Sequence, residues 1–236
     1  AGQRKPLDLE VVVPAEDMAD LANPGAPTIP DPLHIAGDGP TRNSIWPAMY
    51  PALLDLIRAH RSTLVFVNNR RLAERLALRL NELAQEEVAR AHHGSLAAAQ
   101  RVMIEEELKA GRLPALIATS SLELGIDMGA IDLVIQVESP RSVARGIQRV
   151  GRSGHHVGGS SRGKIFPKYR GDLLECAAVV ANMRTADIES THVPRLPLDV
   201  LAQQIVATVA DTPWSVDDLH TLARGASPFG ELSRDQ

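Results

Sequence analysis

Cysteine and aromatic residues are scarce in this chain of 236 residues, which has one Cys and 3% Phe, Trp and Tyr. The single Cys176 excludes an internal disulfide, suits a reducing cytoplasm and, within an apolar helical run, is predicted to pack in the core. So few rings argue against base stacking as the main mode of nucleic-acid contact. No apolar run approaches the ~20 residues that span a bilayer, and no signal-peptide pattern occurs. We therefore expect a soluble, cytoplasmic protein without a membrane partner.

Several signatures of catalytic sites are also missing. The chain has no Gly-x-x-x-x-Gly-Lys-Ser/Thr and no Asp-Glu-x-His, so it lacks the phosphate-cradling loop and the magnesium-holding acids of nucleotide-hydrolysing motors. It also lacks a nucleophile elbow and a His-Glu-x-x-His pattern. The histidine pairs 92–93 and 155–156 are adjacent, whereas two ligands on one helix need a spacing such as i, i+4. The sequence therefore predicts no metal site.

The apolar residues, 44% of the chain with tyrosine and tryptophan included, alternate between strand and helix patterns. Near-continuous apolar runs predict strands at 7–13, 63–67, 87–91, 114–118 and 132–137. Helical spacing predicts helices at 48–60, 70–84, 95–110 and 142–150. Asn68 and Asn69 are predicted as turn or N-cap residues, and Ser95 and Ser142 as N-caps. Strands that alternate with helices of this length indicate an α/β fold, with a parallel sheet and helices on both faces.

Two segments depart from this alternation. Residues 14–47 contain seven prolines and three glycines with little periodicity, which predicts an insertion or a functional loop. After residue 170 the chain reads as helices at 172–184, 198–210 and 216–223, separated by prolines. This tail looks like the start of a second domain, and the abrupt ends of the chain suggest a fragment.

The most basic part of this chain surrounds Ile147–His155, which reads Ile-Gln-Arg-Val-Gly-Arg-Ser-Gly-His. Residues 141–170 hold eight Arg or Lys and no Asp or Glu, although the whole chain has a net charge of -4. Guanidiniums match phosphate oxygens in planar, multi-donor geometry, and glycines let the backbone approach a ligand closely. The stretch indicates phosphate binding, with a plain solvated turn as the alternative.

Three polar groups directly follow predicted strands: Asn68-Asn69-Arg70, His92-His93-Gly94-Ser95 and Thr119-Ser120-Ser121. Ligands of open parallel sheets bind outside the carboxyl ends of the strands, where hydroxyl and N–H groups can bind phosphate. Asp127, a few residues further on, offers a carboxylate to a ribose hydroxyl. Taken singly, the Thr119-Ser120-Ser121 group would favour loop capping, and Asp127 the start of a turn.

In this order, the motifs resemble the second motor domain of a superfamily-2 helicase. The match runs from about Thr63 to His155, and is closest to the large helicase-related, or Lhr-type, ATP-dependent DNA helicases. Residues 197–204, Pro-Leu-Asp-Val-Leu-Ala-Gln-Gln, resemble the beginning of the winged-helix domain of that branch. The resemblance implies a RecA-like parallel sheet with flanking helices over residues 1–170, and the helical start of a truncated winged-helix domain over residues 171–236.

The resemblance also implies roles for individual residues. Arg152 would be the arginine finger towards the γ-phosphate of ATP, with Gln148 beside that phosphate and Arg149 either assisting or holding the loop through a carboxylate. Gly125 and Asp127 would line the sugar side of the nucleotide. The backbone of a single strand would be contacted by Thr119, Asn68, Gly94 and Ser95. One position departs from the family: many relatives have a further arginine where this chain has His155.

As a whole, the family implies the C-terminal motor lobe of an ATP-dependent helicase that moves on single-stranded DNA and unwinds duplexes or RNA–DNA hybrids, usually in DNA repair. ATP would bind between this lobe and the first RecA-like domain of the same parent chain. That domain would supply the Mg²⁺ ligands, so this chain is expected to be inactive alone. The alternatives are an RNA helicase with the same motor and a non-catalytic RecA-like nucleic-acid-binding module. A Rossmann-type enzyme is disfavoured, because no Gly-x-Gly-x-x-Gly follows the first strands.

Overall fold

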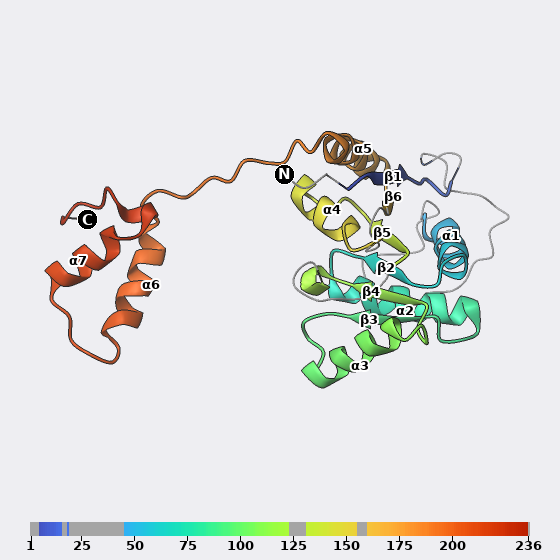
Figure 1. Cartoon of the computed structure of the whole chain (residues 1–236), viewed down its shortest axis with the longest axis horizontal. Coiled ribbons are helices and arrows are strands. Elements are labelled where there is room, and N and C mark those ends of the chain that lie inside the picture. Colours follow the sequence, from blue (N-terminus) through green and yellow to red (C-terminus); the bar gives the residue numbers. More distant parts are fainter. Residues whose placement is uncertain (1–4, 16–17, 19–44, 123–130, 155–159, 236) are drawn as a thin grey trace. The chain divides into compact units, whose positions relative to one another are not determined.

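The computed structural model describes residues 5–15, 18, 45–122, 131–154 and 160–235. In this part of the chain, six strands form one parallel sheet in the order β1-β6-β5-β2-β4-β3 (Figure 1). The strands are β1 (Leu7–Val11), β2 (Thr63–Phe66), β3 (Ala89–His92), β4 (Ala115–Ala118), β5 (Leu133–Val137) and β6 (Ser161–Phe166). The predicted parallel α/β architecture is confirmed.

Helices cover both faces of the sheet and bury two apolar clusters. On one face lie α1 (Trp46–Arg58) and α2 (Arg70–Ala84), and on the other α3 (Ala98–Lys109), α4 (Val143–Val150) and α5 (Arg170–Thr185). Successive side chains of a strand point to opposite faces. In β2, Val65 therefore packs with the first pair of helices, whereas Leu64 and Phe66 pack with the second group. Cys176 of α5 is fully buried, as predicted.

Local sequence explains where several helices begin. The Asn69 side chain accepts a 2.8 Å hydrogen bond from the backbone N–H of Leu72, and Ser142 caps α4 in the same way. Both predicted caps are therefore confirmed. The prediction of Ser95 as an N-cap is wrong: α3 begins three residues later, and its N-cap, Ala97, makes no side-chain bond. Ser95 instead accepts a hydrogen bond from Arg70.

Strand β6 was not predicted, because its apolar content is confined to its last two residues. Its burial alternates, with the small Ser161 and Gly163 facing inward and Arg162 exposed. A Cβ added to Gly163 would lie 2.6 Å from a methyl group of Val150 on α4. Glycine at this position therefore lets α4 lie close against the sheet.

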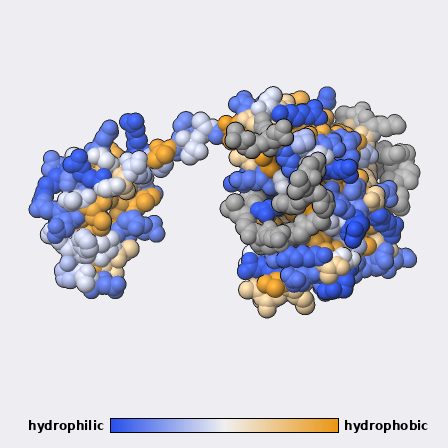
Figure 2. All heavy atoms as spheres, in the orientation of Figure 1, coloured by the Kyte–Doolittle hydropathy of each residue, from blue (hydrophilic) through white to orange (hydrophobic). Residues whose placement is uncertain are grey.

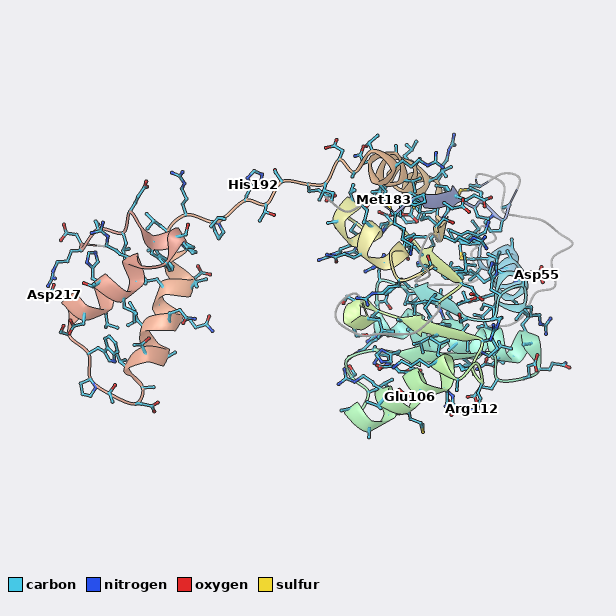
Figure 3. All side chains as sticks on the ribbon, in the orientation of Figure 1. Asp55, Glu106, Arg112, Met183, His192 and Asp217 are labelled. Atoms are coloured by element: carbon cyan, nitrogen blue, oxygen red, sulfur yellow. The ribbon has the colours of Figure 1, made fainter. Side chains whose placement is uncertain are left out.

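Helix α4 is held from its other side by α5. A Cβ on Gly146 would lie 2.6 Å from the sulfur of Met183, which is labelled on α5 in Figure 3. The start of α4 is also tied to the segment after α5, because the Glu189 carboxylate accepts hydrogen bonds from the N–H groups of Val143 and Ala144, at 2.6 and 3.2 Å. Helix α4, which leads into the basic glycine-containing loop, is thus fixed between the sheet and α5.

A second compact unit comprises Ser190–Gln236 and contains α6 (Leu198–Val209) and α7 (Val216–Arg224). Its small core consists of Leu201, Phe229 and Leu232. Figure 2 shows hydrophobic side chains on its surface, where Val206 is 68% exposed. The division falls after Glu189, and α5 packs on β1 and α4 of the first unit. The expected boundary between the motor domain, residues 1–170, and the winged-helix segment, residues 171–236, stays a prediction. In the part of the chain that the structure describes, no helix could cross a membrane.

Candidate functional site

The loops at the carboxyl ends of β2, β5 and β3 are joined through polar side chains. The amide of Asn68, after β2, donates 3.1 Å hydrogen bonds to the Glu138 carboxylate and to the Ser139 carbonyl oxygen, both after β5. Arg70 donates a 2.9 Å bond to the hydroxyl of Ser95, after β3. The structure therefore places the predicted strand-contacting residues Asn68, Gly94 and Ser95 along one edge of the sheet, where Gly94 and Ser95 are exposed.

The loop after β4 rests on a buried histidine. The N–H of Thr119, a predicted strand contact, donates a 3.2 Å bond to the carbonyl oxygen of His92. The His92 ring is fully buried, and its two nitrogens lie 3.3 Å from the Ser121 hydroxyl and 2.9 Å from the Glu105 carboxylate. Burial lowers the pKa of His92 despite the opposing effect of Glu105. A neutral imidazole therefore links α3 to the Thr119 loop.

Two acidic residues at this edge had not been predicted. The buried Asp172 accepts hydrogen bonds from the N–H groups of Ser139 and Lys168, at 2.9 and 2.8 Å, and so ties the loops after β5 and β6 together. Glu138, with a positive φ of 64°, holds Asn68 on one oxygen and lies 3.4 Å from the Lys168 ammonium with the other. The only sequence signal was the position of Glu138 directly after β5.

The loop that carries Arg152 lies at the opposite, amino edge of the sheet. The N–H of Gly154 donates a 2.9 Å bond to the carbonyl oxygen of Ile131, just before β5. The carbonyl oxygen of Ser153 accepts a 2.6 Å bond from Lys5, just before β1. Because α4 runs back across the sheet from the end of β5, it delivers this loop to the edge where the strands begin.

The three predicted phosphate-side residues, on α4 and in the loop that follows it, differ in exposure. Gln148 is exposed and Arg152 is half-buried, whereas the Arg149 side chain points into the sheet and is only 3% exposed. Its guanidinium donates a 2.6 Å bond to the Gln136 side chain and lies 5.1 Å from the centre of the Phe66 ring. This position favours a holding role for Arg149, and the Gln136 amide oxygen is one of its partners.

The candidate residues therefore form two groups on opposite edges of one sheet. Arg152 and Gln148 belong to the amino edge, and Thr119, Asn68 and Ser95 to the carboxyl edge. The predicted nucleotide-sugar residues Gly125 and Asp127, together with His155, lie outside the described residues. No group of three His, Cys, Asp or Glu residues in the described part could hold a metal ion.

Two family models match this chain. Residues 48–156 match the helicase conserved C-terminal domain, and residues 181–236 match the winged helix domain of the large helicase-related protein. The chain belongs to the Lhr helicases.

Individual Lhr proteins agree with this assignment. The Lhr helicase/probable uracil glycosylase of Mycolicibacterium smegmatis is 46% identical over 98% of this chain and 16% of its own length. The ATP-dependent helicase Lhr-Core of Saccharolobus solfataricus is 37% identical over 97% of this chain and 25% of its own length. A solved structure of Mycobacterium smegmatis helicase Lhr bound to ssDNA and AMP-PNP has a TM-score of 0.85, with 51% identity over 98% of this chain and 28% of the solved one. The chain thus spans a sixth to about a quarter of the length of these Lhr relatives.

Proposed function

We propose that this chain is the second motor lobe of an ATP-dependent Lhr helicase that moves on single-stranded DNA. The Saccharolobus solfataricus relative is named an ATP-dependent helicase, and the similar solved Lhr protein binds ssDNA and AMP-PNP. The observation that most supports this proposal is that the candidate phosphate residues and the candidate strand contacts lie on opposite edges of one sheet. One rigid lobe can therefore contact a nucleotide and a nucleic acid at once, without either occupying the site of the other.

At the amino edge, Arg152 is the residue proposed to meet the terminal phosphate of ATP. The loop suits this task, because Ser153 fixes its backbone while Arg152 stays half-exposed. A guanidinium placed there neutralises the charge that develops on the transferred phosphoryl group. Gln148, exposed one turn earlier on α4, is proposed to lie beside the same phosphate. We assign Mg²⁺ coordination to the first RecA-like domain of the parent protein, because this sequence has no Asp-Glu-x-His.

At the carboxyl edge, Thr119, Asn68, Gly94 and Ser95 are proposed to contact the sugar-phosphate backbone. These residues supply hydroxyl, amide and backbone N–H groups, which bind phosphates without reading sequence. Their loops come from three neighbouring strands. The Arg70–Ser95 bond joins the loops after β2 and β3, and the Thr119 N–H bond to the His92 carbonyl oxygen joins the loop after β4 to β3. A change in nucleotide state at the amino edge would move the lobe as one body, and the carboxyl edge would carry the strand with it.

The decisive experiment separates the two edges in the full-length protein that contains this chain. Arg152→Ala should reduce DNA-stimulated ATP hydrolysis by about 10³-fold or more, the usual effect of losing an arginine finger, and leave ssDNA affinity within twofold. Thr119→Val should do the reverse and raise the Kd for ssDNA. Arg145→Ala is the matched control, because Arg145 is an exposed arginine on α4. Wild-type ATP turnover by the Arg152 variant would refute the assignment.

A further inference from the structure

The loop after β6 extends the carboxyl edge beyond the residues assigned so far. This segment consists of Lys168 and Tyr169 with Arg170 at the start of α5. It is joined to the proposed strand contact Asn68 through one side chain, because Glu138 accepts a bond from Asn68 and pairs with Lys168. Strand β6 pairs with β5, which pairs with β2. The loop after β6 therefore follows the loop after β5 along this edge, and it lies two strands away from Asn68.

Tyr169 in this loop is an exposed ring on a fixed backbone. Its relative exposure is 60%, although the chain has only seven aromatic residues in total. The preceding N–H, of Lys168, is held by the buried Asp172 at 2.8 Å. A Cβ on Gly171 would lie 3.2 Å from the Tyr169 ring, so the glycine leaves room for the ring beside the backbone. Because folding has already restricted this loop, the loop would lose little further conformational freedom when a planar ligand binds to it.

Positive residues flank Tyr169 in the chain, and another lies in the loop after β5. Arg170 is exposed, Lys168 is half-buried, and Arg141, in the neighbouring loop after β5, is exposed with a φ of 64°. A positive φ is uncommon for a non-glycine residue. Aromatic rings and cations at one surface are the combination that binds single-stranded nucleic acid, because rings stack on bases while cations neutralise the phosphates.

We propose that Tyr169 stacks on one base of the bound single strand, and that Lys168 and Arg170 contact the phosphates beside it. The inference rests on the proposed function, since it extends the same strand-binding edge. From β3 to β6 the edge crosses four strand intervals, which is about 19 Å at the usual spacing of parallel strands. Backbone contacts occupy the β3, β4 and β2 positions, and the single stacking contact lies at the β6 end.

Tyr169→Ala in the full-length protein tests the stacking contact. The measurement is the Kd for a fluorescent oligonucleotide, by anisotropy at fixed salt. Base–aromatic stacking is worth ~1–3 kcal/mol per base, so the Kd should rise about fivefold to 150-fold. Tyr169→Phe keeps the ring and should bind within twofold of wild type. Leu174→Ala, at a 76% exposed position on α5, is the matched control for loss of an exposed apolar side chain.

Abasic oligonucleotides provide a second measurement, in which each protein is compared with itself on the intact strand. Single abasic nucleotides placed in turn along the strand should identify one position where the wild-type protein loses affinity and the Tyr169→Ala variant loses nothing further. The paired change Lys168→Met and Arg170→Met should reduce the slope of log Kd against log salt concentration by about 1.4, the value for two phosphates of a single strand.

Three outcomes would overturn the stacking proposal. They are an unchanged Kd in Tyr169→Ala, equal abasic profiles in the two proteins, and a change in ATP turnover without a change in Kd. If Thr119→Val still weakens ssDNA binding in the same assay, only the Tyr169 contact fails. If neither variant changes the Kd, the proposed strand-binding edge fails as well.

Discussion

Lys5 donates a 2.6 Å hydrogen bond to the carbonyl oxygen of Ser153, which joins the segment before β1 to the loop that carries Arg152. The same carbonyl oxygen accepts a second bond from the Ser161 hydroxyl at 3.1 Å. Burial lowers the pKa of Lys5, so an ammonium at this place is costly unless it is well paired. We infer that Lys5 is a positioning residue, which sets where the finger loop lies relative to the sheet.

Lys5→Met should therefore slow ATP hydrolysis in the full-length protein. The loop would keep its Ser161 bond but lose its contact with the chain before β1, and a small displacement of a catalytic group can cost about tenfold to hundredfold in kcat. The ssDNA Kd should stay within twofold, because the proposed strand contacts lie at the other edge. Lys164→Met, which removes a neighbouring lysine paired with Glu10, is the control. Equal kcat values in all three proteins would contradict the positioning role.

Arg149→Met should destabilise the fold by about 2–4 kcal/mol. It removes a hydrogen bond from a charged donor to the buried Gln136, and a desolvated cation–π contact with Phe66, each worth roughly 2 kcal/mol. Urea unfolding measures the change, read from the midpoint at constant slope. The exposed Arg145→Met on the same helix should stay within about 0.5 kcal/mol. A similar result for both variants would mean that Arg149 does not hold α4.

The features that the sequence predicts well are those set by near neighbours in the chain. Asn69 and Ser142 were identified as caps, because capping is decided within three residues. Strand β6 was missed because its inward positions are the small Ser161 and Gly163, and the reason for Gly163 is the close approach of Val150 from another element. A pattern of apolar residues cannot reveal a strand whose inward positions are occupied by small residues such as serine and glycine.

The candidate site was predictable in its members but not in its arrangement. The order of the motifs pointed to Arg152 and Thr119, yet nothing local shows that α4 returns the first of them to the amino edge while the second stays at the carboxyl edge. The roles of Glu138 and Asp172 depend on partners 70 and 33 residues away in the chain. Such tertiary bonds leave no periodic trace in a single sequence.

His92 should make the stability of the first unit depend on pH. Its folded pKa lies below the ordinary value of 6.5, because of burial and then the nearby Arg101 and His93, with Glu105 opposing. Above pH 6.5 both states are neutral, and as the pH falls through 6.5 only the unfolded chain takes up the proton, so stability is lost.

The measurement for His92 is the free energy of unfolding at several pH values. From pH 6.5 to 5.5 the wild type should lose more stability than His92→Gln, which has no titrating ring, by at most about 1 kcal/mol. Glutamine can still reach the Glu105 carboxylate, which limits the loss of stability at pH 7.5. Parallel pH profiles for the two proteins would show that His92 is not the titrating group.

Cys176 should be unreactive in the folded protein and so report the opening of α5 from the sheet. Its thiol is fully buried, burial raises its pKa, and its hydrogen bond to Asp172 at 3.6 Å raises the pKa further. As the chain has one cysteine, each labelling event at pH 8 identifies this site. Labelling should be ~10³-fold slower than that of a free cysteine, because it requires local or global unfolding.

Asp172→Asn should accelerate this labelling about tenfold or more. The carboxylate has two oxygens for the N–H groups of Ser139 and Lys168, whereas an amide has one acceptor, and a lost bond to a charged group costs about 1.5–3 kcal/mol. Asp187→Asn, at an exposed position just after α5, should leave the labelling rate unchanged. If Asp172→Asn labels at the wild-type rate, the buried carboxylate does not hold the β5 and β6 loops, and the rigid support proposed for Tyr169 is lost with it.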